Sequence, residues 1–184
     1  MIEKSNFFVF TGGPGVGKTT LIRHLRAMGE RVVEETHRAV IREQVESGGT
    51  AVPWIDAAAY GRITAERDVA IFDLMAGETR RVFFDRGIMD SCGGDGVEPW
   101  PEVLDAVRTH RYNRCIFVFP PWREIYGTDT ERKQDWPEAE RTFGRIMGAL
   151  PPHNYQPVVV PKADVATRAA FVLEHALQAW PSPP

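Results

Sequence analysis

The chain has 184 residues, of which 22 are Lys or Arg and 25 are Asp or Glu, and its formal net charge at pH 7 is −3. This length is typical of one domain with a sizeable core, so we expect a single domain over 1–184. The slightly acidic balance and the wide spread of the basic residues argue against general binding to nucleic acid or to an anionic membrane.

No apolar run approaches the roughly eighteen residues that a membrane span needs, and the N-terminus lacks a basic stretch followed by a signal-length apolar one. Cys92 and Cys115 have no metal-ligand spacing, so both are expected to be free thiols in a reducing compartment. We therefore expect a cytoplasmic protein, either a monomer or a homodimer, with no membrane or nucleic-acid partner.

Five short apolar runs alternate with helical patterns along the chain. The strands are expected at 7–11, 31–35, 81–85, 114–119 and 156–160, and the helices at 18–28, 37–47, 56–76, 98–109, 138–149 and 163–179. This alternation is typical of an α/β fold, a mostly parallel sheet covered by helices on both faces. Ligands of such sheets bind at the carboxyl ends of the strands, so the residues that follow each strand are the candidates for function.

The first strand runs directly into a glycine-rich phosphate-binding pattern. Every fixed position of G-x-x-x-x-G-K-[ST] is matched, and the candidate nucleotide-binding residues are Gly12, Gly13, Pro14, Gly15, Val16, Gly17, Lys18, Thr19 and Thr20. In such a turn the backbone N–H groups point at nucleotide phosphates, Lys18 neutralises the β and γ oxygens, and the Thr19 hydroxyl ligates Mg²⁺. The N-terminus of the following helix adds partial positive charge. A nucleotide with Mg²⁺ is the expected ligand.

The second strand ends on two carboxylates, Glu34 and Glu35, and the next helix carries Arg38 and Arg42 on one face. Side chains alternate along a strand, so one glutamate should point toward a ligand and could accept the proton of an attacking hydroxyl. The two arginines, close to a helix N-terminus, would suit an anionic ligand. A solvated helix start with Glu–Arg pairs explains the same residues equally well.

In the helix at 56–76, Arg67 falls in line with Ile63, Ile71 and Leu74. A charge inside an apolar stripe is costly unless it is paired. Arg67 is therefore expected either to extend its head to water or to contact a ligand.

The third strand ends on Asp85, and Arg86 follows it directly. A carboxylate at this position holds Mg²⁺ in proteins with a phosphate loop, which makes Asp85 the natural partner of Thr19. A helix cap or a salt bridge to Arg86 is the alternative. Hydrolases commonly carry a glutamate next to this acid, whereas a cation suits holding a phosphate or an acceptor oxygen.

The polar segment at about 122–137 follows the fourth strand and has the composition of a closing lid. Arginine on such a segment can close over transferring phosphates and exclude water, and Arg132 is the first candidate, followed by Arg123. A solvated charged loop is the alternative interpretation.

With these residues assembled, the chain resembles the P-loop kinases, in particular nucleoside and nucleoside-monophosphate kinases, and a family of small bacterial proteins labelled AAA-type ATPase domains. The motifs that carry the resemblance are Phe-Thr-Gly-Gly-Pro-Gly-Val-Gly-Lys-Thr-Thr at 10–20, Val-Val-Glu-Glu-Thr-His-Arg at 32–38, Phe-Asp-Arg-Gly-Ile-Met-Asp at 84–90, the run at 120–132 and Val-Val-Val-Pro at 158–161.

The resemblance implies a three-layer sandwich with a five-stranded parallel sheet in the order 2-3-1-4-5. It places Lys18 and Thr19 at the donor phosphates, Asp85 near Mg²⁺ and Arg132 in the lid. It also implies that Glu34 or Glu35, together with Arg86, faces the phosphoryl acceptor.

The favoured function is therefore an ATP- and Mg²⁺-dependent kinase acting on a small acceptor. Arg38, Arg42, Arg67 and Arg86 together favour an anionic acceptor, a nucleoside monophosphate, over a neutral nucleoside. An NTPase or nucleotide-dependent switch that acts on a protein partner is the main alternative, and it would need a water-positioning residue beside Asp85. A non-catalytic nucleotide-binding module is a third, less favoured because Lys18, Thr19 and Asp85 are all present.

Overall fold

The structure is a computed structural model that describes residues 1–92, 97–125 and 136–180. The chain packs as two compact units, each built from several segments. Unit 1 comprises Met1–Lys4, Glu34–Thr79 and Arg86–Arg111, and unit 2 comprises Ser5–Val33, Arg80–Asp85 and Tyr112–Pro184. The expectation of one domain over 1–184 stays a prediction, and each unit is described by itself below.

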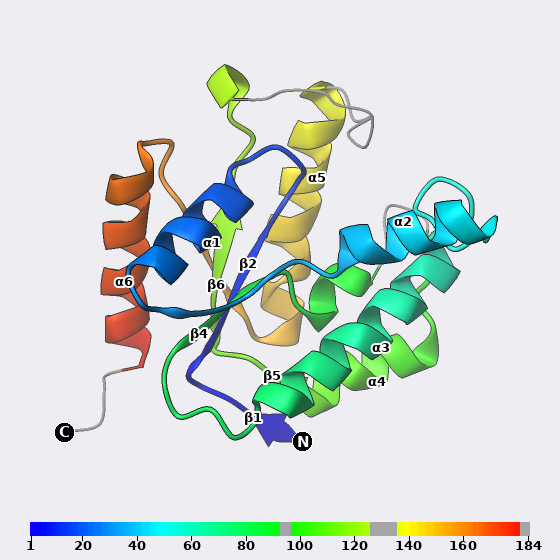
Figure 1. Cartoon of the computed structure of the whole chain (residues 1–184), viewed down its shortest axis with the longest axis horizontal. Coiled ribbons are helices and arrows are strands. Elements are labelled where there is room, and N and C mark those ends of the chain that lie inside the picture. Colours follow the sequence, from blue (N-terminus) through cyan, green and yellow to red (C-terminus); the bar gives the residue numbers. More distant parts are fainter. Residues whose placement is uncertain (93–96, 126–135, 181–184) are drawn as a thin grey trace. The chain divides into compact units, whose positions relative to one another are not determined.

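Unit 2 contains a five-stranded parallel sheet (Figure 1). Its strands stand in the order β3-β4-β2-β6-β7, which is the expected order 2-3-1-4-5 once the five strands are numbered along the chain. The prediction of a parallel α/β sheet in this order is confirmed. The bounds are β2 Phe7–Gly12, β3 Arg31–Val33, β4 Val82–Asp85, β6 Cys115–Phe119 and β7 Gln156–Val159.

The central strands form because they are apolar except at their carboxyl ends, where β2 has Thr11 and Gly12 and β4 has Asp85, so they can be covered on both faces. All residues of β2, β4 and β6 are buried. On one face, Phe8, Phe10 and Phe117 belong to a core cluster with side chains of α1 (Lys18–Ala27) and α6 (Val165–Ala179). Helix α5 (Trp136–Ala149) packs against β2 and β6 from the other face (Figure 1). Unit 2 is thus a three-layer sandwich.

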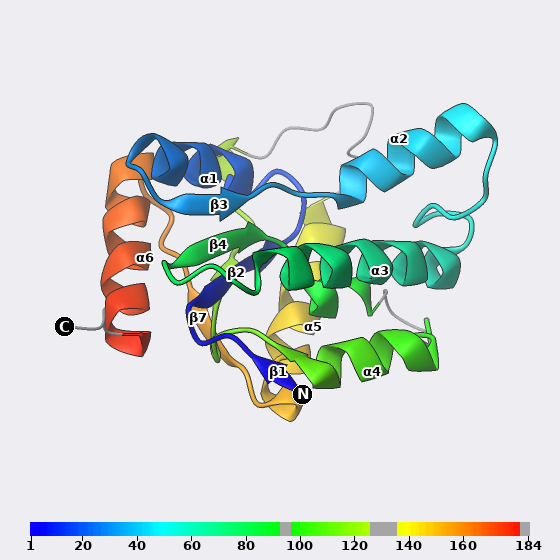
Figure 2. The same cartoon turned by 60° about the horizontal axis from the view of Figure 1, so that its bottom comes forward.

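Unit 1 is mainly helical, with α3 (Ala57–Met75) packed between α2 (His37–Ser47) and α4 (Pro101–Thr109) (Figure 2). The short helix η1 (Ile88–Ser91) also packs against α3. Strands β1 (Ile2–Glu3) and β5 (His110–Arg111) form a two-stranded parallel sheet that was not predicted, because two residues are too few to show a period.

Several element ends differ from the expected ones for identifiable reasons. Strand β3 ends at Val33, so Glu34 and Glu35 lie beyond it. Helix α4 begins only at Pro101, since proline suits the first helical position, where no N–H bond is required. Helix α6 begins after Asp164, whose side chain caps it by accepting from the Thr167 N–H at 2.8 Å. The remaining short helices are η2 (Arg123–Ile125) and η3 (Pro151–His153).

Among the described residues, no helix has the length and apolar character to cross a membrane. Cys92 and Cys115 are free thiols, as predicted. Burial raises the pKa of each thiol to about 11, with Asp90 contributing further at Cys92. Both side chains are therefore neutral near pH 7.

Candidate active site

The phosphate loop of unit 2 joins β2 to α1 and needs glycine for steric reasons. Gly12, Gly15 and Gly17 all have positive φ, at 145°, 76° and 85°. A Cβ on Gly12 would lie 2.8 Å from the Phe119 carbonyl oxygen, on the neighbouring strand β6. The loop can therefore pass this close to the sheet only without a side chain at position 12. Pro14 is partly buried, while the side chain of Val16 packs in the hydrophobic core and so fixes the loop to the rest of unit 2.

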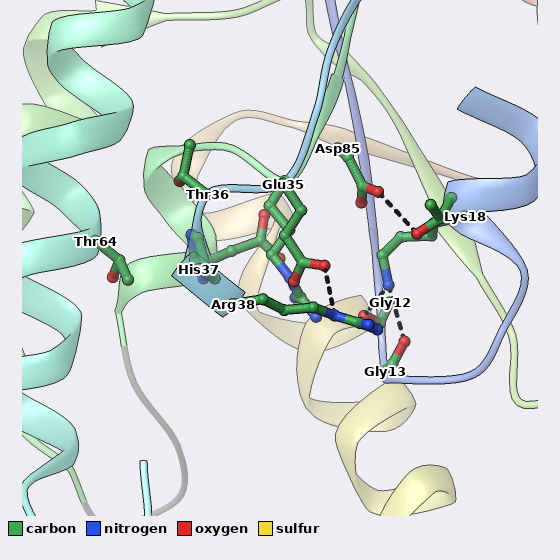
Figure 3. Close-up of polar contacts among 12 residues, drawn as sticks. Gly12, Gly13, Lys18, Glu35, Thr36, His37, Arg38, Thr64 and Asp85 are labelled. Atoms are coloured by element: carbon green, nitrogen blue, oxygen red, sulfur yellow. Dashed lines mark hydrogen bonds and ion pairs between the residues drawn. The ribbon is translucent and has the colours of Figure 1, made fainter. Parts of the chain in front are cut away.

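Lys18 folds back over this loop. Its side chain is buried, and Nζ donates to the carbonyl oxygens of Gly12 at 2.9 Å and Gly13 at 2.8 Å (Figure 3). These two bonds fix the ammonium group beside the loop, so a cation is already in place for phosphate oxygens. Thr19 and Thr20 follow in the first turn of α1 and are exposed.

Asp85 lies at the end of β4 and is buried. Its Oδ2 accepts from the Thr19 hydroxyl, with 3.4 Å between the oxygens. Mg²⁺ prefers hard oxygen ligands at about 2.1 Å, which places neighbouring ligands about 3 Å apart. The hydroxyl and the carboxylate therefore suit one Mg²⁺ ion in both chemistry and spacing.

Arg168, on α6, contacts the same loop and was not singled out from the sequence. Arg168 is only 5% exposed. Its Nη1 donates to the Gly17 carbonyl oxygen at 3.3 Å, and its Nε is buried without a hydrogen-bond partner among the described residues. The guanidinium carbon lies 5.5 Å from the centre of the Trp122 ring. Burial lowers the pKa of Arg168, an effect that Asp164 partly offsets.

The sequence signal for Arg168 was its place in the apolar stripe of the last helix, beside Ala169 and Val172. An apolar stripe on a helix indicates that a charged side chain within it points toward the protein interior, but it does not show which group that side chain contacts. Here it meets the backbone at Gly17, where an added Cβ would lie 2.6 Å from Nη1.

Unit 1 contains a second polar group, the charged cluster of Glu35, Arg38, Arg86 and Asp90. Glu35 Oε1 accepts from Arg86 Nε at 2.7 Å. Glu35 Oε2 lies 3.3 Å from Arg38 Nε (Figure 3). Arg86 Nη1 also donates to Asp90 Oδ1 at 3.3 Å. The carboxylates are well covered, since the side chains of Glu35 and Asp90 are only 12% and 3% exposed.

The backbone of Arg86 is held in an unfavourable conformation. Its φ is 75°, a region that long side chains rarely adopt and that costs on the order of 1–3 kcal/mol. Asp90 supports this turn a second time by accepting from the Gly87 N–H at 2.9 Å. Strain of this kind persists where the surrounding contacts fix a functional side chain.

A further set of contacts fixes the start of α2, directly after Glu35. Asp68 on α3 is buried and accepts from the Thr36 hydroxyl at 3.0 Å, and its Oδ2 lies 3.1 Å from His37 Nε2. Tyr60 meets the His37 ring edge-on. Burial raises the pKa of Tyr60, an effect that Arg86 partly opposes, so its hydroxyl remains protonated.

The other predicted site residues of unit 1 are more exposed. Glu34 and Arg42 have exposed side chains, while Arg67 forms a two-pronged ion pair with Glu43 on α2. The interpretation of Arg67 as a charge in an apolar stripe was wrong. The buried face of α3 instead carries Gly61, Thr64, Ala65, Asp68, Phe72 and Met75, and Leu74 is 82% exposed.

Much of the expected lid at 122–137 lies outside the described residues, and so does Arg132. Arg123, the second candidate, has its guanidinium carbon 5.0 Å from the centre of the Trp136 ring. Its side chain therefore has an aromatic neighbour within unit 2.

Comparison with known proteins identifies the family. Residues 7–168 match the model of a family described as AAA domain. The chain belongs to this family. A comparison with curated proteins gave no match.

Solved structures show the same fold as this AAA domain. Deoxyadenosine kinase from M. mycoides, with dCMP and dCDP bound, has a TM-score of 0.63 at 12% identity over 94% of this chain and 99% of that one. Thymidylate kinase from Ehrlichia chaffeensis has a TM-score of 0.58 at 17% identity over 94% and 97%. Shikimate kinase from Acinetobacter baumannii, in complex with shikimate, has a TM-score of 0.53 at 15% identity over 95% and 94%. The chain therefore has the fold of P-loop kinases.

Proposed function

We propose that this AAA-domain protein is an ATP-dependent phosphotransferase that moves the γ-phosphoryl group to a small acceptor, a nucleoside monophosphate or a nucleoside. One observation carries the proposal. The residue after the buried acid Asp85 is Arg86, and its guanidinium is bonded to the carboxylate of Glu35. A carboxylate oriented by arginine can take a proton from an alcohol.

Unit 2 supplies the donor half of the proposed reaction. The N–H groups of the loop from Gly12 to Gly17 and the N-terminus of α1 would hold the phosphates of ATP. Lys18 would contact the β and γ oxygens, while Thr19 and Asp85 would hold Mg²⁺. When bound, Mg²⁺ neutralises negative charge that develops on the phosphates.

Unit 1 supplies the acceptor half. In the proposed reaction the acceptor hydroxyl oxygen attacks the γ-phosphorus of ATP, and its proton passes to a carboxylate oxygen of Glu35. The bond from the γ-phosphorus to the β,γ-bridging oxygen breaks, which releases ADP and leaves the phosphorylated acceptor. Arg86 holds Glu35 in one orientation through the bond at 2.7 Å.

The solved structures with this fold support the same reaction class, because all three are named as kinases of small molecules. The second candidate is an NTPase that acts as a switch on a protein partner. The presence of an arginine after Asp85, where a switch would place a water-positioning carboxylate, favours the kinase.

The test is ADP formation from ATP and Mg²⁺ with a panel of nucleosides, nucleotides and sugars. We expect slow ADP release alone and an increase of orders of magnitude with a suitable acceptor, because a positioned nucleophile supplies much of the rate. Glu35→Gln should lower kcat by about a hundredfold or more. Glu46→Gln, an exposed change on α2, is the matched control. Rapid ADP release that no acceptor changes would establish the switch instead.

A further inference from the structure

Summed over its four named side chains, the charged cluster of unit 1 has no net formal charge. Its two guanidinium groups, Arg38 and Arg86, are bonded to two carboxylates, Glu35 and Asp90. Arg86 contacts both acids, so neither acid belongs to one arginine alone. Two of the four arginines that the sequence offered as an anion site, Arg38 and Arg86, therefore already compensate largely covered negative charge.

This balance disfavours an acceptor that carries a phosphate. A phosphate bonded to Arg38 or Arg86 would stand beside the carboxylates of Glu35 and Asp90, and like charges at such distances repel strongly where water is limited. Displacing either acid from its arginine would remove an ion pair from a carboxylate that is largely covered, which is strongly unfavourable.

Arg67 is also paired, so it does not add an uncompensated positive charge that a phosphate could use. Its two terminal nitrogens both donate to the carboxylate of Glu43, and this bond raises the pKa of Arg67 while lowering that of Glu43. The pair is partly exposed, with 36% and 55% of the two side chains accessible. A phosphate bonded to Arg38, Arg67 or Arg86 would therefore lie beside a carboxylate that the arginine already contacts.

A neutral hydroxyl compound fits the same cluster without this cost. A hydroxyl group donates one hydrogen bond and accepts two. It can donate to Glu35 and accept from an arginine N–H group, since each guanidinium has five donors. Both contacts leave the charge balance unchanged.

We propose that the acceptor is an uncharged polyhydroxy compound of the nucleoside or sugar type, with no phosphate. This inference rests on the proposed kinase function. It narrows that function to the transfer of a first phosphoryl group to a neutral alcohol. The reaction that supplies the substrate must then release a free hydroxyl compound, as hydrolysis of a phosphate ester or of a glycosidic bond does.

The experiment compares matched pairs of acceptors: cytidine with CMP, uridine with UMP, thymidine with dTMP, and ribose with ribose 5-phosphate. ADP release and the ³¹P spectrum of the product give kcat/KM for each compound. We expect the neutral member of every accepted pair to have at least a tenfold higher kcat/KM. Its KM should also stay constant between about 50 and 300 mM salt, since no charge pair forms with the acceptor.

A second arm changes the balance itself. Asp90→Asn leaves the cluster with one excess positive charge and should shift the preference toward the phosphorylated members by about tenfold. Asp105→Asn, an exposed aspartate on α4 of the same unit, is the matched control.

A higher kcat/KM for the phosphorylated members in the wild-type protein, with a KM that rises with salt, would overturn the inference and leave the kinase function standing. ADP release that no acceptor of either kind increases would overturn the kinase function, and this inference with it. The same preference in wild type and Asp90→Asn would show that the cluster does not select the acceptor.

Discussion

The phosphate loop and the charged cluster are built by opposite means. The loop is one continuous stretch whose shape depends on backbone conformation, and its main cation, Lys18, bonds to carbonyl oxygens within the same stretch. The cluster gathers side chains from positions 35, 38, 86 and 90, and its shape depends on four mutual charges. A loop of the first kind can be recognised in a sequence, whereas a cluster of the second kind exists only once the chain has folded.

The difference should appear in which kinetic constant each region controls. Changes in the loop should weaken nucleotide binding and turnover whatever the acceptor is. Changes in the cluster should alter acceptor use and leave nucleotide affinity nearly constant. The predictions below test this separation, from the largest expected effect to the smallest.

Lys18→Ala should have the largest effect. It removes the cation that we propose to contact the β and γ phosphates, and we expect turnover to fall by about a thousandfold. ADP release measures turnover, nucleotide titration measures affinity, and circular dichroism checks the fold. A folded Lys18→Ala protein with wild-type affinity and activity would remove the phosphate-loop assignment.

Asp85→Asn should lower Mg²⁺-dependent turnover by about a hundredfold, because the carboxylate acts through the metal. Nucleotide binding in the presence of EDTA should change far less. The two titrations, with and without Mg²⁺, are compared in the same protein. Equal weakening in both would show that Asp85 is structural, as its buried position would also allow.

Arg168→Lys should raise the KM for ATP by about tenfold and leave the acceptor KM unchanged. Lysine keeps the charge but has no planar group that could combine a bond to the Gly17 carbonyl with a position over the Trp122 ring. Arg141→Lys, an exposed arginine on α5, is the matched control. A rise in both KM values would place the effect in the general stability of unit 2, not in its phosphate loop.

Asp68→Asn tests whether the start of α2 is held by charge. Asparagine keeps the shape but weakens the contacts with Thr36 and His37, and we expect α2 amides to lose about 1–2 kcal/mol of protection in hydrogen exchange. The effect on turnover should be a few-fold and should fall on kcat, through Glu35. Unchanged α2 protection would mean that Asp68 does not hold this helix.

The smallest effect concerns the thiols. Because folding raises the pKa of Cys92 and Cys115 from about 9 to about 11, the folded state favours the neutral thiol. Their contribution to stability is fully present below pH 9 and is lost as the pH rises toward 11. At pH 8 the thiolate fraction is about a hundredfold smaller than in the unfolded chain, so iodoacetamide should react correspondingly slowly. Equal rates of alkylation by iodoacetamide for the folded protein and for the protein unfolded in urea would contradict the raised pKa of the thiols.

Sequence patterns alone determined the fold of the sheet and located the glycine-rich loop proposed for the donor nucleotide. The five strands, their order and the loop from Gly12 to Thr19 could all be predicted, because apolar runs and glycine requirements are local properties of the chain. The proposed role of Asp85 at Mg²⁺ followed from its place at a strand end, and the structure places Asp85 beside Thr19.

Only the tertiary structure decided the partners of the arginines. Arg38 and Arg86 share Glu35, Arg67 pairs with Glu43 from another helix, and Arg168 reaches Gly17 from a position 151 residues away in the chain. A charge pattern gives the sign of a side chain but not its neighbour, because pairing is set by distances between segments that the sequence does not encode locally. Of the four arginines that suggested an anionic acceptor, Arg38, Arg67 and Arg86 thereby became counterions of the protein's own carboxylates, and Arg42 has an exposed side chain.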